Sequence, residues 1–277
     1  MPAHHPPHWQ IIIVNFRTGA LAAAAARFAR TALGATGSVT VVDSASGDDS
    51  VSVIRSVPGV ELVPLESNHG FGAALNAGAL KSDSEFILCA NADTRVRADL
   101  LAVFEDRFRR LPRLGVLGPR LLSADGSAQP SARHFPTHAS LFWSRQSPLR
   151  RWLGARGRHY ILPEPQSFTL CDVVAGACFG VRRTVWEELK GMDEGFFLYL
   201  EDTDFCFRAK KAEWLVGYDP QVQVEHLWGA STSANPAASS KRHRESLLYY
   251  FRKHHPNRAL ANGLLTLALR LGRKPLP

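Results

Sequence analysis

The densest group of acidic side chains is Glu201, Asp202 and Asp204, three carboxylates within four residues. Like charges at this spacing repel one another, so such a group is typical of a place where a cation, an arginine or a proton transfer uses it. Acids also favour the first turn of a helix, and a solvated helix start is the alternative. Aromatic residues flank the group, which favours a functional site: Phe196, Phe197, Tyr199, Phe205 and Phe207.

A second acid, Asp93, follows the apolar run 86–90 with Asn91 two residues before it. A carboxylate at the carboxyl end of a buried strand can hold a divalent cation that also binds diphosphate oxygens. Asp93 is equally well placed to cap a helix over 99–111, and the residue types leave both interpretations open. His226, after a β-like run, is by itself more typical of a structural histidine than of a metal ligand.

The segment 68–78 contains three glycines and two asparagines, among them Asn68, Gly70 and Asn76. Glycine at a strand-to-helix turn lets the backbone approach a phosphate or a sugar. The segment matches neither the dinucleotide-binding glycine pattern nor a P-loop, and the chain has no nucleophile elbow of the hydrolase type. Kinase, nicotinamide-dependent and serine-hydrolase functions therefore find no support.

The elements that must position these residues alternate along the first half of the chain. Four apolar runs predict strands buried on both faces, and three segments between them predict helices. Such alternation predicts an α/β fold with a mostly parallel sheet, whose ligands bind beyond the carboxyl ends of the strands. A further strand is expected at 173–181 and a helix at 184–190. The strands are expected at 11–14, 39–42, 60–65 and 86–90, and the helices at 20–33, 49–57 and 72–81.

The charge of the chain is unevenly distributed. The 277 residues carry 33 Lys and Arg against 25 Asp and Glu, a net charge of +8. Residues 241–277 contain nine basic residues and one acid, so the excess lies in the tail, while 159–240 is acidic and 133–158 holds six arginines without an acid. Apolar residues make up 45% of the chain, which excludes intrinsic disorder. The start of the chain resembles neither a signal peptide nor a spanning helix, and the four cysteines lack metal spacing, so buried free thiols are expected.

Five motifs in order resemble those of family 2 of the inverting nucleotide-sugar glycosyltransferases, of the GT-A fold, and in particular its bacterial rhamnosyltransferase-like branch. Val41–Ser46 looks like V-V-D-N-x-S, and Ala90–Asp93 looks like the L-N-P-D version of D-x-D. The segment 68–78 resembles N-x-G-F-a-x-a-x-N-x-G, and Met192–Arg208 resembles F-D-E-x-F-F-x-Y-x-E-D-x-D-L-x-x-R. Pro220–Ser231 is similar to P-x-a-x-v-x-H-x-x-g-x-S.

The resemblance implies a role for each matching residue. Asp202 would be the catalytic base, and Asp93 and His226 would bind Mg²⁺ or Mn²⁺. Asn91 stands where the full motif has its first acid, a departure that weakens the expected metal binding. Glu201, Asp204 and Arg133, which starts an R-x-F-P match, would support the acceptor site. The residues expected to bind the donor are Asn15, Asp43, Asn68, Gly70, Asn76 and Asn91.

The resemblance also implies substrates and organisation. The donor would be dTDP-L-rhamnose, with UDP-galactofuranose or another UDP-hexose as alternatives, and the acceptor a glycan or polyprenyl-diphosphate-linked saccharide in cell-surface polysaccharide synthesis. We expect five segments: a flexible N-terminus (1–9), a nucleotide-sugar-binding half (10–122), a variable acceptor loop (123–168), an acceptor and catalytic half (169–240) and a basic amphipathic tail (241–277).

Two basic segments of the chain could bind anionic partners. The arginines of 145–158 lie among aromatic residues, as in a solvated loop or in a site for a diphosphate-linked lipid. The tail combines leucines with basic residues, so it can lie on an anionic membrane or pack against the body. We expect a cytoplasmic enzyme, peripheral at the inner membrane. A non-catalytic nucleotide-sugar-binding protein is an alternative; nucleic acid is not an expected partner, because no recognition motif is present.

Overall fold

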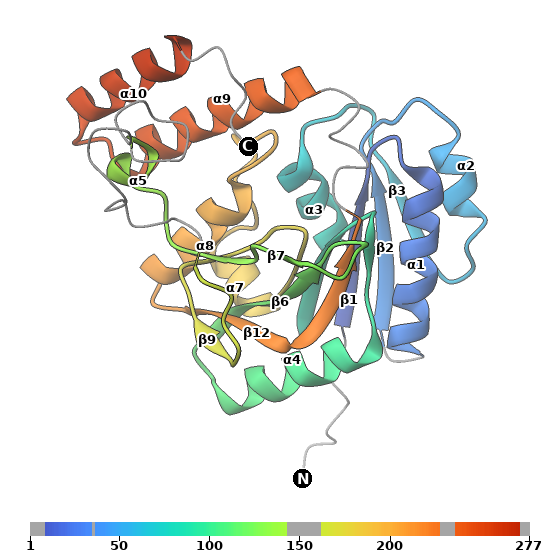
Figure 1. The fold of residues 1–277 in the computed structure, drawn as a ribbon. Coiled ribbons are helices and arrows are strands. Elements are labelled where there is room, and N and C mark those ends of the chain that lie inside the picture. Colours follow the sequence, from blue (N-terminus) through green and yellow to red (C-terminus); the bar gives the residue numbers. More distant parts are fainter. Residues whose placement is uncertain (1–8, 35–36, 143–161, 228–235, 272–277) are drawn as a thin grey trace.

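The computed structural model describes residues 9–34, 37–142, 162–227 and 236–271. A ten-stranded, mostly parallel sheet runs through the molecule in the order β3-β2-β1-β4-β11-β6-β12-β5, with β7 paired to β6 and β9 to β12. Helices cover it (Figure 1). The strands are β1 Trp9–Asn15, β2 Gly37–Asp43, β3 Glu61–Pro64, β4 Phe86–Asn91, β5 Thr94–Arg95, β6 Leu114–Leu122, β7 Ala128–Gln129, β8 Ala132–Arg133, β9 Thr169–Leu170, β10 Val173–Val174, β11 Cys178–Arg182 and β12 Leu215–His226.

The helices of the described residues flank this sheet and extend beyond it. They are α1 Gly19–Leu33, α2 Ser50–Arg55, α3 Phe71–Ala79, α4 Ala98–Arg110, α5 His138–Phe142, α7 Arg183–Glu188, α8 Glu201–Lys211, α9 Pro236–His254 and α10 Ala259–Leu271. None of them is both long and apolar enough to cross a membrane.

Strand β1 shows why the sheet needs helices on both faces. Its side chains alternate between two apolar layers, as the pleat requires. Ile11 and Ile13 pack with α1 and α4, whereas Ile12 and Val14 pack with α3, α7 and α8. Continuous runs of β-branched residues are therefore the expected sequence for the central strands.

Two of the predicted strands differ from the structure. The run 60–65 forms β3, which is an edge strand with Glu61 exposed and not a strand buried on both faces. The run 173–181 forms two strands, β10 and β11, because a turn at 175–177 interrupts it. A continuous apolar run does not reveal a turn, and Gly176 was the only signal of one in the sequence.

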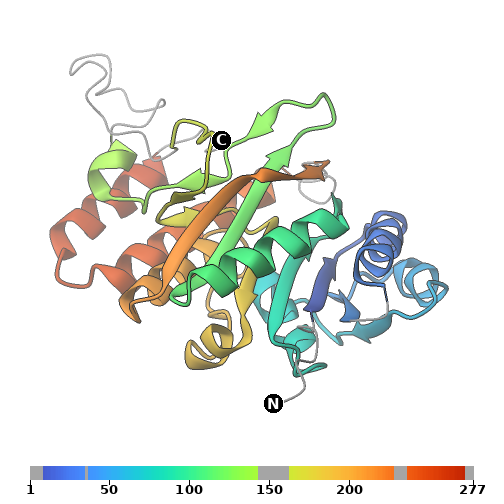
Figure 2. The ribbon, with the colours of Figure 1, turned by 90° about the horizontal axis from the view of Figure 1, so that it is seen from below.

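The strand β11 joins the two halves of the sheet. It runs antiparallel to β4 on one side and to β6 on the other, whereas β1 to β4 pair in parallel. A separate two-stranded sheet pairs β10 with β8. Figure 2 shows the result: the first strands and helices lie at one end of the molecule, and α9 and α10 lie at the other.

Helices α9 and α10 form a layer beside α5 and over α8 (Figure 1). Leu247, Tyr250 and Phe251 of α9 are buried with Phe196 and Leu200 in a third apolar cluster, which also includes one leucine of α10. The tail therefore packs on the body through α9, and the expected boundary at 240/241 falls inside this helix. The expected N-terminal tail, apart from its last residue, lies outside the described residues.

The four cysteines, Cys89, Cys171, Cys178 and Cys206, are free and buried. Burial raises the pKa of each thiol, so these groups stay protonated and act as small apolar side chains. The expectation of buried free thiols is confirmed.

Candidate active site

Polar side chains meet where three neighbouring parallel strands end. In the register of the sheet, Asn15 at the end of β1 lies opposite Asp43 at the end of β2, and Val14 lies opposite Asn91 at the end of β4. The amide of Asn15 donates to Oδ1 of Asp43 at 2.6 Å. Both side chains are buried. The strand ends thus bring Asn15, Asp43 and Asn91 to one edge of the sheet, as the sequence predicted.

Ser46 completes the hydrogen bonding of Asp43. Its backbone N–H donates to Oδ2 of Asp43 at 3.0 Å and its hydroxyl donates to Oδ1 at 2.5 Å. The loop after β2 therefore folds back onto its own acid. The two carboxylate oxygens are held in place, so Asp43 is a fixed acceptor at the sheet edge.

Asp93 and His226 face each other across the end of β4. Their side chains are each 10% exposed, and Nε2 of His226 lies 3.3 Å from Oδ1 of Asp93. The amide nitrogen of Asn91 lies 3.4 Å from the same Nε2. Strand β12 carries His226 to this place because it pairs antiparallel with β5, with His226 opposite Thr94.

Gln129 sets the tautomer of His226. The amide nitrogen of Gln129 donates to the carbonyl of His226 at 2.9 Å, which leaves Oε1 of Gln129 to accept a proton from Nδ1 at 2.7 Å. With the proton on Nδ1, the lone pair of Nε2 points toward a carboxylate. Nε2 can then accept from the amide of Asn91 or, together with Asp93 at 3.3 Å, bind a cation.

Asp93 and His226 fit a divalent cation that takes its remaining ligands from a bound substrate and from water. Asp93 and His226 supply one oxygen and one nitrogen, and among the described residues no group of three or more His, Cys, Asp or Glu is arranged to hold a metal. Mg²⁺ in phosphate-binding sites commonly takes one or two carboxylates and completes its shell with phosphate oxygens and water. The fit is therefore to a cation held jointly with a diphosphate.

The glycine-rich turn joins the two halves of the molecule. Gly70 has a φ of +99°, and a Cβ there would lie 2.1 Å from the carbonyl oxygen of Phe197. The side chain of Asn68 accepts a hydrogen bond from the Gly70 N–H. Asn76 exchanges hydrogen bonds with the backbone of Met192 at 2.8 and 3.0 Å. In this arrangement Asn76 positions the segment before α8, and its contact with a donor stays a prediction.

Asp202, in the first turn of α8, is surrounded by donors. Its Oδ2 accepts from Nη2 of Arg133 at 2.5 Å and from the Gly176 N–H at 2.9 Å. Its Oδ1 accepts from the backbone N–H and the hydroxyl of Thr203 at 2.6 and 3.0 Å. The side chain of Asp202 is 13% exposed, so it lies near the surface of a site and is not a solvated helix start.

Gly176 and Ala177 connect Asp202 with the strand ends. The carbonyl of Ala177 accepts from the N–H of Asn91 at 2.9 Å, while the neighbouring Gly176 binds Asp202. A Cβ on Gly176 would lie 3.2 Å from the Cβ of Asp202, so only glycine permits this approach without a shift. Residues more than 100 positions apart in the sequence are thereby brought to one site.

Glu201 is buried beside Asp202. Burial, followed by the charge of Asp202, raises the pKa of Glu201 to about 8, and its Oε2 has no hydrogen-bond partner among the described residues. On α9, burial and the charge of Arg133 lower the pKa of His243 to about 4. Both groups are therefore uncharged at neutral pH, which leaves Arg133 and Asp202 as the charged pair at the start of α8.

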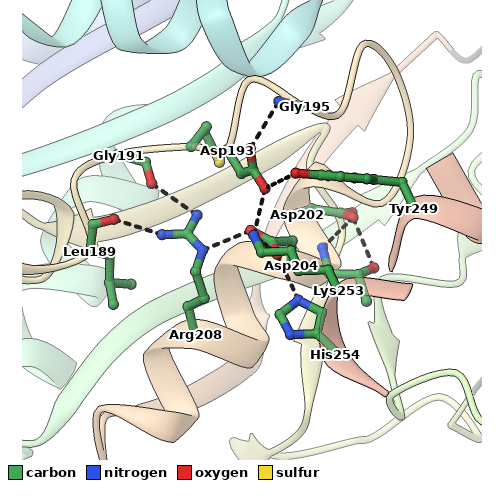
Figure 3. Close-up of polar contacts among 12 residues, drawn as sticks. Leu189, Gly191, Asp193, Gly195, Asp202, Asp204, Arg208, Tyr249, Lys253 and His254 are labelled. Atoms are coloured by element: carbon green, nitrogen blue, oxygen red, sulfur yellow. Dashed lines mark hydrogen bonds and ion pairs between the residues drawn. The ribbon is translucent and has the colours of Figure 1, made fainter. Parts of the chain in front are cut away.

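Asp204 fastens α8 to α9 (Figure 3). Its carboxylate is fully buried and binds Arg208 at 2.7 Å, Lys253 at 2.6 Å and His254 at 2.7 Å. Burial alone would raise the pKa of Asp204, but the hydrogen bond from His254 and the charge of Arg208 hold it below its ordinary value. Lys253 also binds Asp193 at 2.5 Å. Asp204 therefore holds the helix that carries Asp202, and its expected support of the acceptor site stays a prediction.

A family model described as glycosyl transferase family 2 matches residues 36–189, more than half of the chain. The chain belongs to this family. The match includes the ends of β2 and β4 and the turn that contacts Asp202. The sequence resemblance to this family is therefore confirmed.

Two relatives of this glycosyltransferase are named as glycosyltransferases themselves. It is 31% identical, over 79% of its length and 75% of the relative, to the N-acetylglucosaminyl-diphospho-decaprenol L-rhamnosyltransferase of Mycobacterium tuberculosis. It is 22% identical, over 60% of its length and 52% of the relative, to the low-salt glycan biosynthesis hexosyltransferase Agl10 of Haloferax volcanii.

Two solved structures share the fold of this glycosyltransferase. The mannosyltransferase PcManGT from Pyrobaculum calidifontis, in complex with GDP-Man and Mn²⁺, matches with a TM-score of 0.59 at 14% identity, over 98% of this chain and 78% of that one. S. aureus TarS 1–349 matches with a TM-score of 0.54 at 14% identity, over 96% and 75%. The expected GT-A type α/β fold is confirmed.

Several residues of the site were missed by the sequence analysis. Gln129 ends the two-residue strand β7 and Gly176 lies in a turn. Neither is part of a motif, and their importance depends on contacts with residues 97 and 26 positions away. Ser46 ends a recognised motif but was not given a role. Lys253 was counted only as part of the basic tail. The arginines of 145–158 and the aromatic residues beside them lie outside the described residues.

Proposed function

We propose that this glycosyltransferase transfers L-rhamnose from dTDP-L-rhamnose, with inversion, to a saccharide linked to a polyprenyl diphosphate in cell-surface polysaccharide synthesis. The observation that carries the proposal is the contact of Gly176 with Asp202 and of Ala177 with Asn91. It puts a candidate base next to the strand ends of a nucleotide-sugar fold. The sugar and the acceptor rest on the mycobacterial rhamnosyltransferase.

The donor would bind along the strand ends. Asp43, held by Asn15 and Ser46, would accept a hydrogen bond from the pyrimidine ring, and Asn15 would lie near the base and ribose. The backbone around Asn68 and Gly70 and the amide of Asn91 would contact the diphosphate or the sugar. A fixed, buried acceptor favours one hydrogen-bonding partner, because an unpaired acceptor in such a site is costly.

Mg²⁺ or Mn²⁺ would be held by Asp93 and His226 together with the donor diphosphate. When bound, the metal neutralises charge on the departing nucleoside diphosphate. The protein contributes the orientation of His226 through Gln129 and the proximity of Asn91, whose amide keeps the site polar. The Mn²⁺ in the structure of the mannosyltransferase supports this choice of metal.

The reaction would be one displacement at the anomeric carbon. The acceptor oxygen forms a bond to that carbon while its proton passes to Asp202, and the bond to the diphosphate oxygen breaks with its electron pair. General-base assistance is typically worth about 10²–10⁴-fold in rate. Glu201, Arg133 and Asp204 would set the charge and the position of Asp202 without touching the sugar.

A panel of nucleotide sugars tests the donor. Thermal unfolding is followed with dTDP-L-rhamnose, UDP-galactofuranose and UDP-glucose, each with Mn²⁺, Mg²⁺ or EDTA, and transfer to N-acetylglucosaminyl-diphospho-farnesol is measured in parallel. We expect the largest metal-dependent stabilisation, and transfer, with dTDP-L-rhamnose. Preference for a UDP-hexose would favour the second candidate function, hexosyl transfer, which the Haloferax hexosyltransferase supports. Stabilisation without transfer or hydrolysis would favour a non-catalytic binding protein.

A peripheral place at the cytoplasmic face of the inner membrane is part of the proposal. Helix α10 buries Leu265 but exposes Leu260, Leu264 and Leu267, at 80%, 51% and 54%, along one face. Four basic residues accompany this helix in the sequence, and each Lys or Arg near an anionic leaflet contributes about 1 kcal/mol; they are Arg258, Arg270, Arg273 and Lys274. The stripe and the charge together suit an anionic lipid surface.

Vesicle sedimentation tests the membrane contact. The double variant L264S/L267S should bind vesicles of phosphatidylcholine and phosphatidylglycerol more weakly than the wild type, because both side chains are exposed and their loss does not disturb the core. Leu80→Ser is the matched control, since Leu80 is 86% exposed and lies at the end of α3, outside the tail. Equal binding of all three proteins would contradict the assignment of this face.

A further inference from the structure

The carboxylate of Asp202 has no room for another donor. An ionised carboxylate offers about four lone-pair sites on two oxygens. Arg133 and Gly176 occupy Oδ2, and the two donors of Thr203 occupy Oδ1. A general base must accept a hydrogen bond from the hydroxyl that it deprotonates. In this arrangement one donor has to leave before Asp202 can act.

The four donors differ in their freedom to leave. Two of them are backbone N–H groups, and the one from Gly176 is fixed by the turn between β10 and β11. The third, the hydroxyl of Thr203, is neutral and lies on the same helix turn as Asp202. The fourth is the long side chain of Arg133, which is 19% exposed and carries a charge. Arg133 is therefore the donor whose position an incoming ligand can change.

The backbone that carries Arg133 is held by hydrogen bonds, so the side chain can change position while the backbone stays in place. Strand β8 pairs with β10, with Arg133 opposite Val173. The next residues are held by Asp172, which accepts from the Phe135 N–H and binds Lys210 at 2.5 Å. The same small sheet thus delivers Arg133 and, through the following turn, Gly176 to one oxygen of Asp202.

The chemistry of the pair selects the ligand that can release it. A guanidinium leaves a carboxylate readily only for another anion, because an unpaired charge in a largely buried site is costly. Glu201 and His243 nearby are uncharged at neutral pH and offer no replacement. A diphosphate offers pairs of anionic oxygens that can accept two parallel N–H bonds from one arginine.

We propose that Arg133 is a latch on Asp202 that opens when an acceptor carrying a diphosphate binds. The proposal rests on the proposed function, in which Asp202 is the base and the acceptor sugar is linked to a diphosphate. Arg133 moves from Asp202 to the acceptor diphosphate, which frees one lone pair on Oδ2 for the acceptor hydroxyl. Arg133 is thus a positioning residue for the base, and it makes the enzyme prefer an acceptor that carries a diphosphate.

The latch also protects the donor. Without an acceptor, water is the competing nucleophile: its oxygen bonds to the anomeric carbon, its proton passes to Asp202, and the nucleoside diphosphate leaves with the electron pair. While Arg133 occupies Oδ2, this proton transfer lacks its acceptor site. The closed latch therefore suppresses donor hydrolysis, and its removal should release it.

Arg133→Met tests the latch, with dTDP-L-rhamnose as donor. Hydrolysis is measured without acceptor, and transfer to N-acetylglucosaminyl-diphospho-farnesol is compared with transfer to octyl N-acetylglucosaminide, which is neutral. We expect acceptor-free hydrolysis to rise about tenfold in the variant, the effect of one hydrogen bond to a charged group. We also expect the wild type to have a higher kcat with the diphosphate acceptor and the variant to lose this preference.

Two further variants serve as controls. Arg133→Lys keeps a charge and should restore part of the preference. Arg120→Met removes an arginine of similar exposure, 18%, that pairs with Glu164, and should leave the ratio of hydrolysis to transfer unchanged. Thermal unfolding of each variant shows whether it is folded, and the wild-type comparison of the two acceptors needs no variant.

The outcomes separate the two proposals. An active wild type with the same kcat for both acceptors would overturn the latch alone. The same holds for an Arg133→Met variant that loses hydrolysis and transfer in equal proportion and keeps the preference. A wild type that neither hydrolyses nor transfers any nucleotide sugar of the panel would overturn the proposed function, and the latch with it.

Discussion

Two carboxylates of the candidate site, Asp93 just after β4 and Asp202 in the first turn of α8, have opposite surroundings. Among the described residues, the side chain of Asp93 has one polar neighbour, Nε2 of His226 at 3.3 Å. Asp202 accepts four hydrogen bonds, one of them from an arginine. The first acid suits a cation that arrives with a substrate, and the second is oriented by hydrogen bonds from the protein itself. The surroundings of Asp93 therefore suit an added cation, whereas Asp202 already has a cationic partner in Arg133.

The largest effect is expected at Asp202. Asp202→Asn should lower kcat by about 10²–10⁴-fold, because the amide cannot take the acceptor proton, while the affinity for the donor stays within about twofold. Turnover and donor binding are measured separately. Asp106→Asn, on the exposed face of α4, is the control. A variant with nearly normal kcat would remove Asp202 from the chemistry.

A smaller effect, on stability, is expected at the fastening of α8. Lys253→Met should lower the free energy of unfolding by about 2–3 kcal/mol, because it removes a cation from the buried Asp204 and the partly buried Asp193. Denaturant unfolding measures the change. Lys241→Met, which removes an exposed pair on the same helix, should cost less than about 0.5 kcal/mol. Equal effects would mean that the buried network does not fasten the helix.

At the strand ends the expected change is in metal affinity. Gln129→Leu should weaken Mn²⁺ binding in the presence of the donor by about 10–100-fold, because Nδ1 of His226 loses its acceptor and the ring its orientation. Titration by calorimetry measures the affinity. Gln223→Leu, an exposed residue on β12, is the control. Unchanged affinity in the Gln129 variant would mean that His226 does not hold the metal.

A further expected effect concerns Glu201 and the dependence of stability on pH. Its pKa is raised from 4.5 to about 8, so this carboxyl contributes stability below about pH 4.5 and loses that contribution as the pH rises toward 8. The wild type should therefore lose stability relative to Glu201→Gln across this window. Unfolding of both proteins at several pH values measures the difference, in which the other titrating groups cancel. A constant difference would show that Glu201 is not held protonated.

The sequence predicted the parts of the molecule that depend on local patterns. Runs such as 11–14 and 86–90 locate central strands because burial on both faces demands apolar residues, and the residues after them mark the ligand edge. The motifs predicted Asp93, Asp202 and His226 as residues of one site, and the structure brings Asp93 and His226 together.

What the sequence did not reveal depends on distant contacts. The turn at Gly176, the orientation of His226 by Gln129 and the pairing of Arg133 with Asp202 all join segments with no shared pattern. The tail is a similar case: its basic residues suggested an appendage, whereas Lys253 binds the buried Asp204 and α9 packs on the body. Helix α10 exposes three leucines. The composition of a segment gives its net charge, but it does not show which residues pair with the charged side chains.

The stereochemistry of the product tests the central claim most directly. A nuclear magnetic resonance spectrum of the disaccharide formed from dTDP-L-rhamnose gives the anomeric configuration of the new bond. A single displacement assisted by Asp202 predicts the configuration opposite to that of the donor. Retention of the donor configuration would contradict the account, because it requires a different mechanism in which Asp202 is not simply a base.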